Sequence, residues 1–173
     1  MSGLTPVRRI VTGHDGAGRS VVIEDAPATN LVRNPVRADR GLINLWATGA
    51  QAGCGDPDPM AGAPHGLNPP PGGTVFRFFQ IPPGGDPEEV RAGFAAMQGA
   101  HNQVDTRRDP SMHRTSSVDY IVCLEGEIVM LLDEGEVTMR PHDVLIQRGT
   151  NHGWVNRGGE TALMMAVLVD AKN

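Results

Sequence analysis

Three side chains that could bind a metal ion or move protons lie on two predicted strands or in the extended segment that leads into one. His113 and Asp119 share one face of an extended segment, because side chains alternate along a strand with a period of two. His152 lies on a later predicted strand, on the same face as Trp154. Two imidazoles and a carboxylate from neighbouring strands can converge on one divalent ion, and this donor set suits iron(II) and related metals. The pattern predicts a metal site at His113, Asp119 and His152.

A second interpretation of the same three residues needs no metal. A lone histidine on a strand is often exposed or hydrogen-bonded for structural reasons, and a buried polar group requires hydrogen-bond partners. His113, Asp119 and His152 then form a hydrogen-bond network in a pocket that binds a small ligand or acts as a sensor. The two interpretations differ in one measurable property, which is the metal content of the purified protein.

The second half of the chain is divided into short segments that carry these residues. Runs of apolar or alternating residues are separated by turns rich in Gly, Asp and Asn, and this regular spacing predicts an all-β barrel or sandwich. Polar groups at the start of a strand with apolar residues further along suit the open mouth of a barrel. The predicted strands are residues 118–124, 127–132, 136–140, 144–147, 152–156 and 161–170.

The first half of the chain contains fewer predicted elements. Residues 8–24 have the pattern of a β-hairpin, and residues 41–47 and 74–81 are predicted strands on either side of a loop rich in Gly and Pro. Such a long loop is usually functional or poorly ordered. Asp86 and Pro87 suit the start of a helix that continues to about residue 98, the one helix that the sequence predicts.

The segment from His113 to Gly126 and the segment from Pro141 to Asn156 resemble the two motifs of the cupin superfamily. The first cupin motif reads H-x-H, three or four residues, an acid, six residues and Gly, and the second contains P-G-D, then P-x-G-x-x-H and an Asn. The resemblance covers about residues 74 to 170. Within the superfamily, the chain is similar to a bacterial subgroup of small, single-barrel cupins with an N-terminal extension. The matching residues are His113, Asp119, Gly126, Pro141, Asp143, Gly149, His152 and Asn156.

Four positions depart from the cupin pattern. Thr115 stands at the second His of the first motif, so one of the four ligands that the resemblance implies is missing. Asp119 replaces Glu and shortens the reach of the carboxylate by one methylene. His142 and Gln147 replace the Gly and the Pro of the second motif. A metal held by the remaining three residues, whether iron, manganese, nickel or zinc, is expected to bind more weakly than in a complete site.

The resemblance implies an all-β fold, the cupin double-stranded β-helix, a jelly-roll-like barrel. We expect a β extension with a Pro/Gly-rich loop at residues 1–73 and the barrel at residues 74–173. The implied function is that of a metalloenzyme acting on a small organic substrate, as an oxygenase, isomerase or lyase/dehydratase. The alternative is a metal-free cupin that binds or senses a small ligand. Trp154 and Phe78 suit either a pocket wall or the core, and the residues predicted to face the substrate are Thr115, Gln147, Trp154 and Phe78.

Charge and the N-terminal sequence set the remaining expectations. The 20 acidic residues outnumber the 15 Lys and Arg residues, which argues against a nucleic-acid partner. No long apolar run follows Arg8 and Arg9, so the sequence predicts neither a secretory signal nor a membrane span. We therefore expect a cytoplasmic location. The unpaired edges of the hairpin at residues 8–24 predict a homodimer, because a second subunit would protect them.

Overall fold

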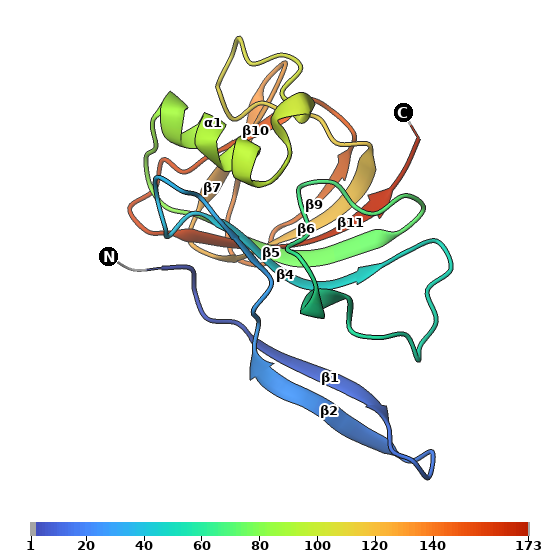
Figure 1. Ribbon diagram of the computed structural model, residues 1–173. Helices are drawn as coiled ribbons and strands as arrows, with labels where there is room; N and C mark the ends of the chain where they lie inside the picture. Colours follow the sequence, from blue (N-terminus) through green and yellow to red (C-terminus); the bar gives the residue numbers. More distant parts are fainter. Residues whose placement is uncertain (1–2, 173) are drawn as a thin grey trace.

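Two antiparallel sheets of unequal size face each other across the core of the molecule (Figure 1). The computed structural model describes residues 3–172. The larger sheet has the strand order β3-β4-β5-β11-β6-β9, the smaller sheet has the order β10-β7-β8, and β1 and β2 form a separate hairpin. The strands are β1 (Arg8–His14), β2 (Ser20–Pro27), β3 (Leu31–Arg33), β4 (Gly41–Thr48), β5 (Thr74–Ile81), β6 (Ser117–Glu125), β7 (Ile128–Leu132), β8 (Glu136–Met139), β9 (Val144–Arg148), β10 (His152–Val155) and β11 (Ala162–Asp170).

The predicted all-β architecture is confirmed, and the strands of the second half lie within two residues of their expected bounds. Strand β6 shows the predicted alternation, since Asp119, Ile121 and Cys123 are buried while Tyr120 is 49% exposed on the outer face. Strand β3 was not predicted from the sequence, because a run of three residues carries too little periodicity to be recognised.

The core lies between the larger and the smaller sheet. Strands β5, β6 and β11 of the larger sheet contribute one side of the core, and β7, β8 and β10 of the smaller sheet contribute the other. Aliphatic and sulfur-containing side chains dominate this core, as the low aromatic content of the chain requires. Its fully buried members include Val75, Cys123, Ile128, Ala162 and Met164.

Helix α1 (Pro87–Ala96) packs over one end of the barrel (Figure 1) and contacts β3. The side chain of Asp86 accepts a hydrogen bond of 2.8 Å from the backbone N–H of Glu89, and Pro87 occupies the first turn, so the predicted start of the helix is confirmed. The buried side chains Val90 and Phe94 pack against Leu67. The apolar face of α1 therefore turns toward the barrel.

The second part of the loop before β5, from about residue 58, is attached to the barrel, whereas residues 49–57 are exposed. It contains a 3-10 turn, η1 (Pro59–Ala61), whose Met60 joins the main core. Further along, Asn44 on β4 donates a hydrogen bond of 2.9 Å to the carbonyl of His65. Because β4 pairs with β5 in the larger sheet, segments on both sides of residue 74 share one sheet, and the division of the chain into 1–73 and 74–173 stays a prediction.

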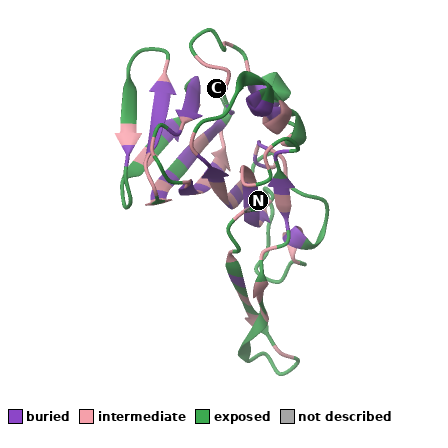
Figure 2. Cartoon of the chain, turned by 90° about the vertical axis from the view of Figure 1, so that its left-hand side faces the viewer, coloured by how far each residue is buried: buried purple, intermediate pink, exposed green. Residues whose placement is uncertain are grey.

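The hairpin of β1 and β2 extends away from the barrel, and its far end is largely exposed (Figures 1 and 2). Buried Arg9 attaches its base, because the guanidinium pairs with Asp58 of the loop and with Glu24 and lies over the ring of Trp46. Beyond this attachment the apolar side chains of Ile10, Val22 and Ile23 are more than half exposed. Among residues 3–172 no helix is long and apolar enough to span a membrane.

Two glycines in tight turns allow a matched test of this packing. Gly126, between β6 and β7, has φ +71°, and a Cβ there would lie 2.7 Å from the carbonyl oxygen of Thr161. Gly135, between β7 and β8, has φ +78° but nothing within 4 Å of its Cβ position. Gly135→Ala should lower the free energy of unfolding by about 1 to 2 kcal/mol, the cost of a left-handed conformation. Gly126→Ala should cost a further ~1 to 3 kcal/mol, because the backbone must move. Urea denaturation measures both losses, and equal losses would contradict this description of the turn.

Candidate active site

A cavity of about 110 Å³ lies inside the barrel beneath helix α1. One face of α1, the inner faces of β5, β6 and β11 and residues from β3, β4 and β10 form its walls. Most of the wall is apolar, with the rings of Phe79, Phe94 and Trp154 around it. The residues predicted from the sequence that line this cavity are His113, Thr115, Asp119, His152 and Trp154.

Two of the predicted substrate-facing residues do not line the cavity. Phe78 lies on the opposite face of β5, where its ring is 6.1 Å from that of Phe76, because the inward positions of this strand are Val75, Arg77 and Phe79. Phe79 takes the expected place of Phe78 and packs against Trp154, with 5.6 Å between the ring centroids. Gln147 is fully buried on β9 and acts on the site through His152, as described below.

The backbone brings the two predicted histidines together. His113 and His152 form a β-bridge in which each N–H donates to the carbonyl of the other, at 2.8 and 2.9 Å. Directly opposed residues carry their side chains on the same face, and the two ring centroids are 4.3 Å apart. Phe94 of α1 covers the ring of His113 at 4.8 Å.

Hydrogen bonding fixes the tautomer of His113. Its Nδ1 is 2.9 Å from the carbonyl oxygen of Ser111, and a carbonyl can only accept, so Nδ1 carries the proton and donates. Nε2 therefore keeps its lone pair. Burial lowers the pKa of His113 to about 4, so the ring is neutral at physiological pH.

The opposite tautomer follows for His152. The backbone N–H and hydroxyl of Thr150 both donate to Oε1 of Gln147, which orients the amide so that its Nε2 points at Nδ1 of His152, 2.7 Å away. Nδ1 also lies 3.0 Å from the carbonyl oxygen of Thr150, but that oxygen already accepts a hydrogen bond of 2.9 Å from the same amide. The shorter contact with the amide decides the tautomer, so Nδ1 accepts and the ring proton resides on Nε2. Burial, followed by the proximity of His113, lowers the pKa of His152 to about 3. The pair thus offers one acceptor and one donor nitrogen, both uncharged.

Asp119 is a buried carboxyl group on the same inner surface. Burial raises the pKa of Asp119 to about 6, while the hydroxyl of Ser117, the charge of Arg77 and the hydroxyl of Thr115 oppose this rise. Its side chain is 3% exposed, and its Oδ1 has no hydrogen-bond partner among the described residues. A carboxyl group with this pKa exchanges its proton close to neutral pH.

Arg77 places a positive charge in the wall of the same cavity. The guanidinium donates hydrogen bonds of 2.7 and 3.2 Å to the carbonyls of Gly66 and Leu67. Burial lowers the pKa of Arg77 to about 10, against the attraction of Asp119, so the group stays charged at neutral pH. The sequence contained a signal for this residue, because an Arg stands at an inward position of the otherwise apolar strand β5.

The arrangement does not fit the predicted three-ligand metal site. Among residues 3–172 no three His, Cys, Asp or Glu side chains lie close enough to hold one ion. Histidines that bind metals usually donate their second N–H to a carbonyl or carboxylate, as His113 does to Ser111. In His152 the bond from Gln147 leaves the proton on Nε2, so an ion could bind there only in the other tautomer, in which Nδ1 donates to the carbonyl of Thr150 at 3.0 Å.

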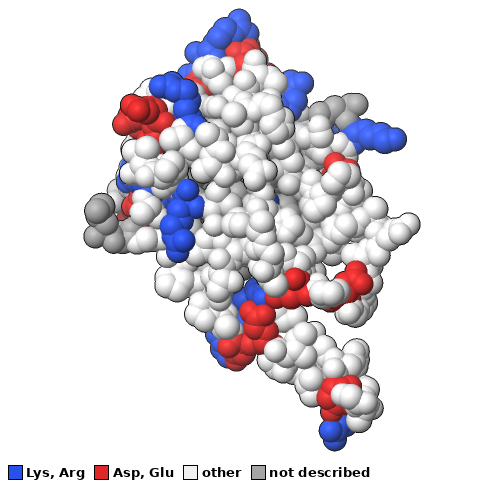
Figure 3. Space-filling model, in the orientation of Figure 1, with Lys and Arg blue, Asp and Glu red and all other residues white. Residues whose placement is uncertain are grey.

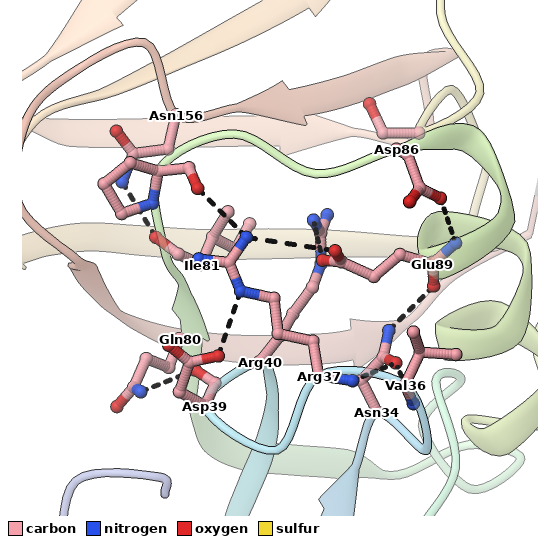
Figure 4. A network of polar contacts seen from close by, with 12 residues as sticks. Asn34, Val36, Arg37, Asp39, Arg40, Gln80, Ile81, Asp86, Glu89 and Asn156 are labelled. Carbon is pink, nitrogen blue, oxygen red and sulfur yellow. Dashed lines mark hydrogen bonds and ion pairs between the residues drawn. The ribbon is translucent and has the colours of Figure 1, made fainter. Parts of the chain in front are cut away.

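A polar network, which the sequence did not predict, holds α1 over the cavity (Figure 4). Asn34 donates a hydrogen bond of 2.7 Å to the carbonyl of Glu89, and the buried Glu89 carboxylate pairs with Arg40 at 3.4 Å and Arg37 at 3.8 Å. Burial lowers the pKa of Arg40, which also lines the cavity. Elsewhere, on the face shown in Figure 3, charged side chains lie in small separate groups and form no continuous basic surface.

Comparison with known proteins identifies several fungal relatives. A phomopsin biosynthesis cluster protein from Diaporthe leptostromiformis is 30% identical over 95% of this chain and 78% of its own length. A cupin-domain-containing oxidoreductase, FogC, from Aspergillus ruber is 29% identical over 100% of this chain and 77% of its own length. The predicted bacterial subgroup is not confirmed by these relatives.

Comparisons with family models and with solved structures add little to this assignment. No family model matches the chain. Among solved structures, an ethanolamine utilization protein from Salmonella typhimurium aligns with a TM-score of 0.47 and 11% identity, over 97% of this chain and 99% of that one.

The assigned tautomers can be tested by changing Gln147. In the native protein the ring proton of His152 should be on Nε2 and that of His113 on Nδ1. Gln147→Glu replaces the donating amide by a carboxylate that only accepts, so the proton of His152 should move to Nδ1. Two-dimensional ¹H–¹⁵N spectra of the ring nitrogens distinguish the forms, and His113 serves as the internal control. A proton on Nδ1 of His152 in the native protein would contradict the assignment.

Proposed function

Since the chain belongs to the cupin superfamily, we propose that it is an enzyme that transfers protons on a small organic substrate bound inside the barrel, as an isomerase or a lyase/dehydratase. The observation that carries this proposal is the buried carboxyl group of Asp119 in the wall of an apolar cavity. A general acid or base works best when its pKa lies near the working pH, and burial gives Asp119 a pKa of about 6.

Asp119 acts as the base in this proposal. Above its pKa the carboxylate removes a proton from the substrate, and the protonated carboxyl group returns it at a later step. The positive charge of Arg77 stabilises the ionised form of Asp119. Arg77 forms its hydrogen bonds with the carbonyls of Gly66 and Leu67 and not with Asp119, so the carboxylate remains free to accept a proton.

The two neutral imidazoles supply hydrogen bonds of opposite direction. The Nε2–H of His152 donates to a substrate oxygen that gains negative charge as the proton leaves, and a neutral imidazole suits this role when its pKa is strongly lowered. Nε2 of His113 accepts a hydrogen bond from the substrate or from a neighbouring donor. Helix α1 above the cavity limits the access of water, which strengthens each of these interactions.

A metal-dependent reaction is the second candidate function. It is favoured by the close approach of the His113 and His152 rings and by the name oxidoreductase of the relative from Aspergillus ruber. In this alternative His113, Asp119 and His152 would have to rearrange around iron, manganese, nickel or zinc. A third outcome, a cupin that binds or senses a small ligand without turnover, uses the same hydrogen-bonding groups.

The proton-transfer function predicts a specific pH dependence. On a substrate found by screening small alcohols, ketones and hydroxy acids, kcat/KM should rise with pH through about 6 and then level off, because only ionised Asp119 accepts a proton. Asp119→Asn should lower kcat by roughly 10²-fold or more. Glu134→Gln, which changes an exposed carboxylate in the β7–β8 turn, should leave kcat unchanged.

Treatment with a chelator separates the candidate functions. Protein dialysed against EDTA should keep its activity if proton transfer by side chains suffices. Loss of activity that iron, manganese, nickel or zinc restores would support the metalloenzyme instead. Tight binding of a ligand that is never converted would support the binding or sensing cupin.

We also propose that the protein is a cytoplasmic homodimer that uses the exposed part of the β1–β2 hairpin as its interface. The exposed side chains of Ile10, Val22 and Ile23 supply apolar area there. Light scattering at micromolar concentration should give twice the monomer mass. The double substitution Val22→Thr and Ile23→Thr keeps β-propensity but removes apolar surface, so it should shift the protein toward monomer. A monomeric native protein would rule out this proposal.

A further inference from the structure

Three buried polar atoms in the cavity wall have no hydrogen-bond partner among residues 3–172. They are the hydroxyl oxygen of Thr115, Oδ1 of Asp119 and Nε of Arg77. Each of the three residues is at most 3% exposed, and all three line the cavity. Buried polar groups are normally paired, since each unpaired one costs on the order of 1–3 kcal/mol. Three such atoms facing one cavity indicate that a bound group pairs with them.

The sheet explains why these atoms share one place. Asp119 on β6 and Arg77 on β5 flank β11, opposite Leu168 and Ala166 respectively, and all four residues face inward. Thr115 precedes β6 with the same parity as Asp119. The hydroxyls of Ser117 and Thr115 and the charge of Arg77 all oppose the rise in the pKa of Asp119, so these groups lie near its carboxylate, although neither hydroxyl reaches it with the geometry of a full hydrogen bond.

We infer that Thr115, Asp119 and Arg77 form a subsite for a hydroxyl group of the substrate. The Nε–H of Arg77 is only a donor, an ionised Asp119 is only an acceptor, and the hydroxyl of Thr115 is either. A substrate hydroxyl donates its proton to Asp119 while its oxygen accepts from Arg77 or Thr115. A carbonyl group could satisfy the donors but would place its oxygen against the carboxylate, and a carboxylate substrate would be repelled by Asp119.

The rest of the cavity indicates that the part of the substrate next to this hydroxyl is apolar. Phe79, Phe94, Ile121 and Trp154 surround the remaining space. An apolar cavity of about 150 Å³ accepts a benzene ring, so a six-membered ring is the right scale for a cavity of about 110 Å³ that is open at one side. The substrate class is therefore a hydroxyl-bearing compound whose carbon skeleton near the hydroxyl is apolar.

This inference rests on the proposed function, because it names the substrate group that is held against Asp119 before the proton transfer. In the bound state the substrate hydroxyl donates a hydrogen bond to the Asp119 carboxylate, and no covalent bond changes. The two proposals still fail separately, because the subsite can be measured by binding alone, without turnover.

The test uses three probes of one shape, namely cyclohexanol, cyclohexanone and methylcyclohexane. Calorimetric titration of the full-length protein at pH 8, where Asp119 is ionised, should give a Kd for cyclohexanol at least tenfold lower than for either of the others. Thr115→Val and Asp119→Leu should each reduce this preference at least fivefold. Thr138→Val removes a hydroxyl on β8 that does not line the cavity, and should change the preference less than twofold.

Equal or tighter binding of methylcyclohexane or cyclohexanone by the native protein would overturn the hydroxyl subsite. So would a failure of all three probes to bind. These measurements on the native protein stand even if a variant fails to fold. A loss of turnover in Asp119→Asn with no preference for cyclohexanol would retain the proton-transfer function and reject the subsite, and the reverse result would retain the subsite and reject the function.

Discussion

Closure of the two sheets around an apolar interior constrains every other feature of this molecule. A side chain at an inward position of β5, β6 or β11 is removed from water, and a polar one must be paired by the protein or by a ligand. Most inward positions satisfy this constraint with apolar residues such as Val75, Ile121 and Met164. Arg77 and Asp119 do not, and their altered pKa values are the electrostatic consequence. The same burial that makes them costly for folding makes them chemically useful.

Strand alternation was enough to predict much of this arrangement from the sequence. It placed Thr115, Asp119 and Ile121 on one face of the segment that leads into and forms β6, and His152 with Trp154 on another strand, and all five residues line the cavity. Alternation predicts faces but not distances, so it could not show that Asp119 and the two histidines, among residues 3–172, do not come together as one three-ligand group. It also could not decide between Phe78 and Phe79, since that requires knowing which face of β5 turns inward, and the Arg at position 77 was the clue to it.

Contacts between remote parts of the chain were outside the reach of sequence reasoning. Helix α1 was predicted correctly from Asp86 and Pro87, yet nothing local shows that it covers the barrel through Phe94 and His113. Gln147 was expected to contact the substrate. Instead its amide donates to Nδ1 of His152 and so keeps the ring proton on Nε2. The replacement of a motif residue by Gln thus changes the hydrogen-bonding character of a ring five positions later, a link that only the three-dimensional contact reveals.

Arg77 is held by the main chain of the loop before β5 and not by any of its side chains. Both of its hydrogen bonds within the protein end on carbonyl oxygens, those of Gly66 and Leu67. The guanidinium therefore depends on the path of the loop. That path is tied to the end of helix α1, because the N–H of Leu67 donates a hydrogen bond of 2.7 Å to the carbonyl of Met97, and a Cβ at Gly66 would lie 2.7 Å from the same oxygen. A change at residue 66, or an insertion or deletion beside it, would move the two carbonyls away from Arg77 and shift the positive charge in the cavity wall.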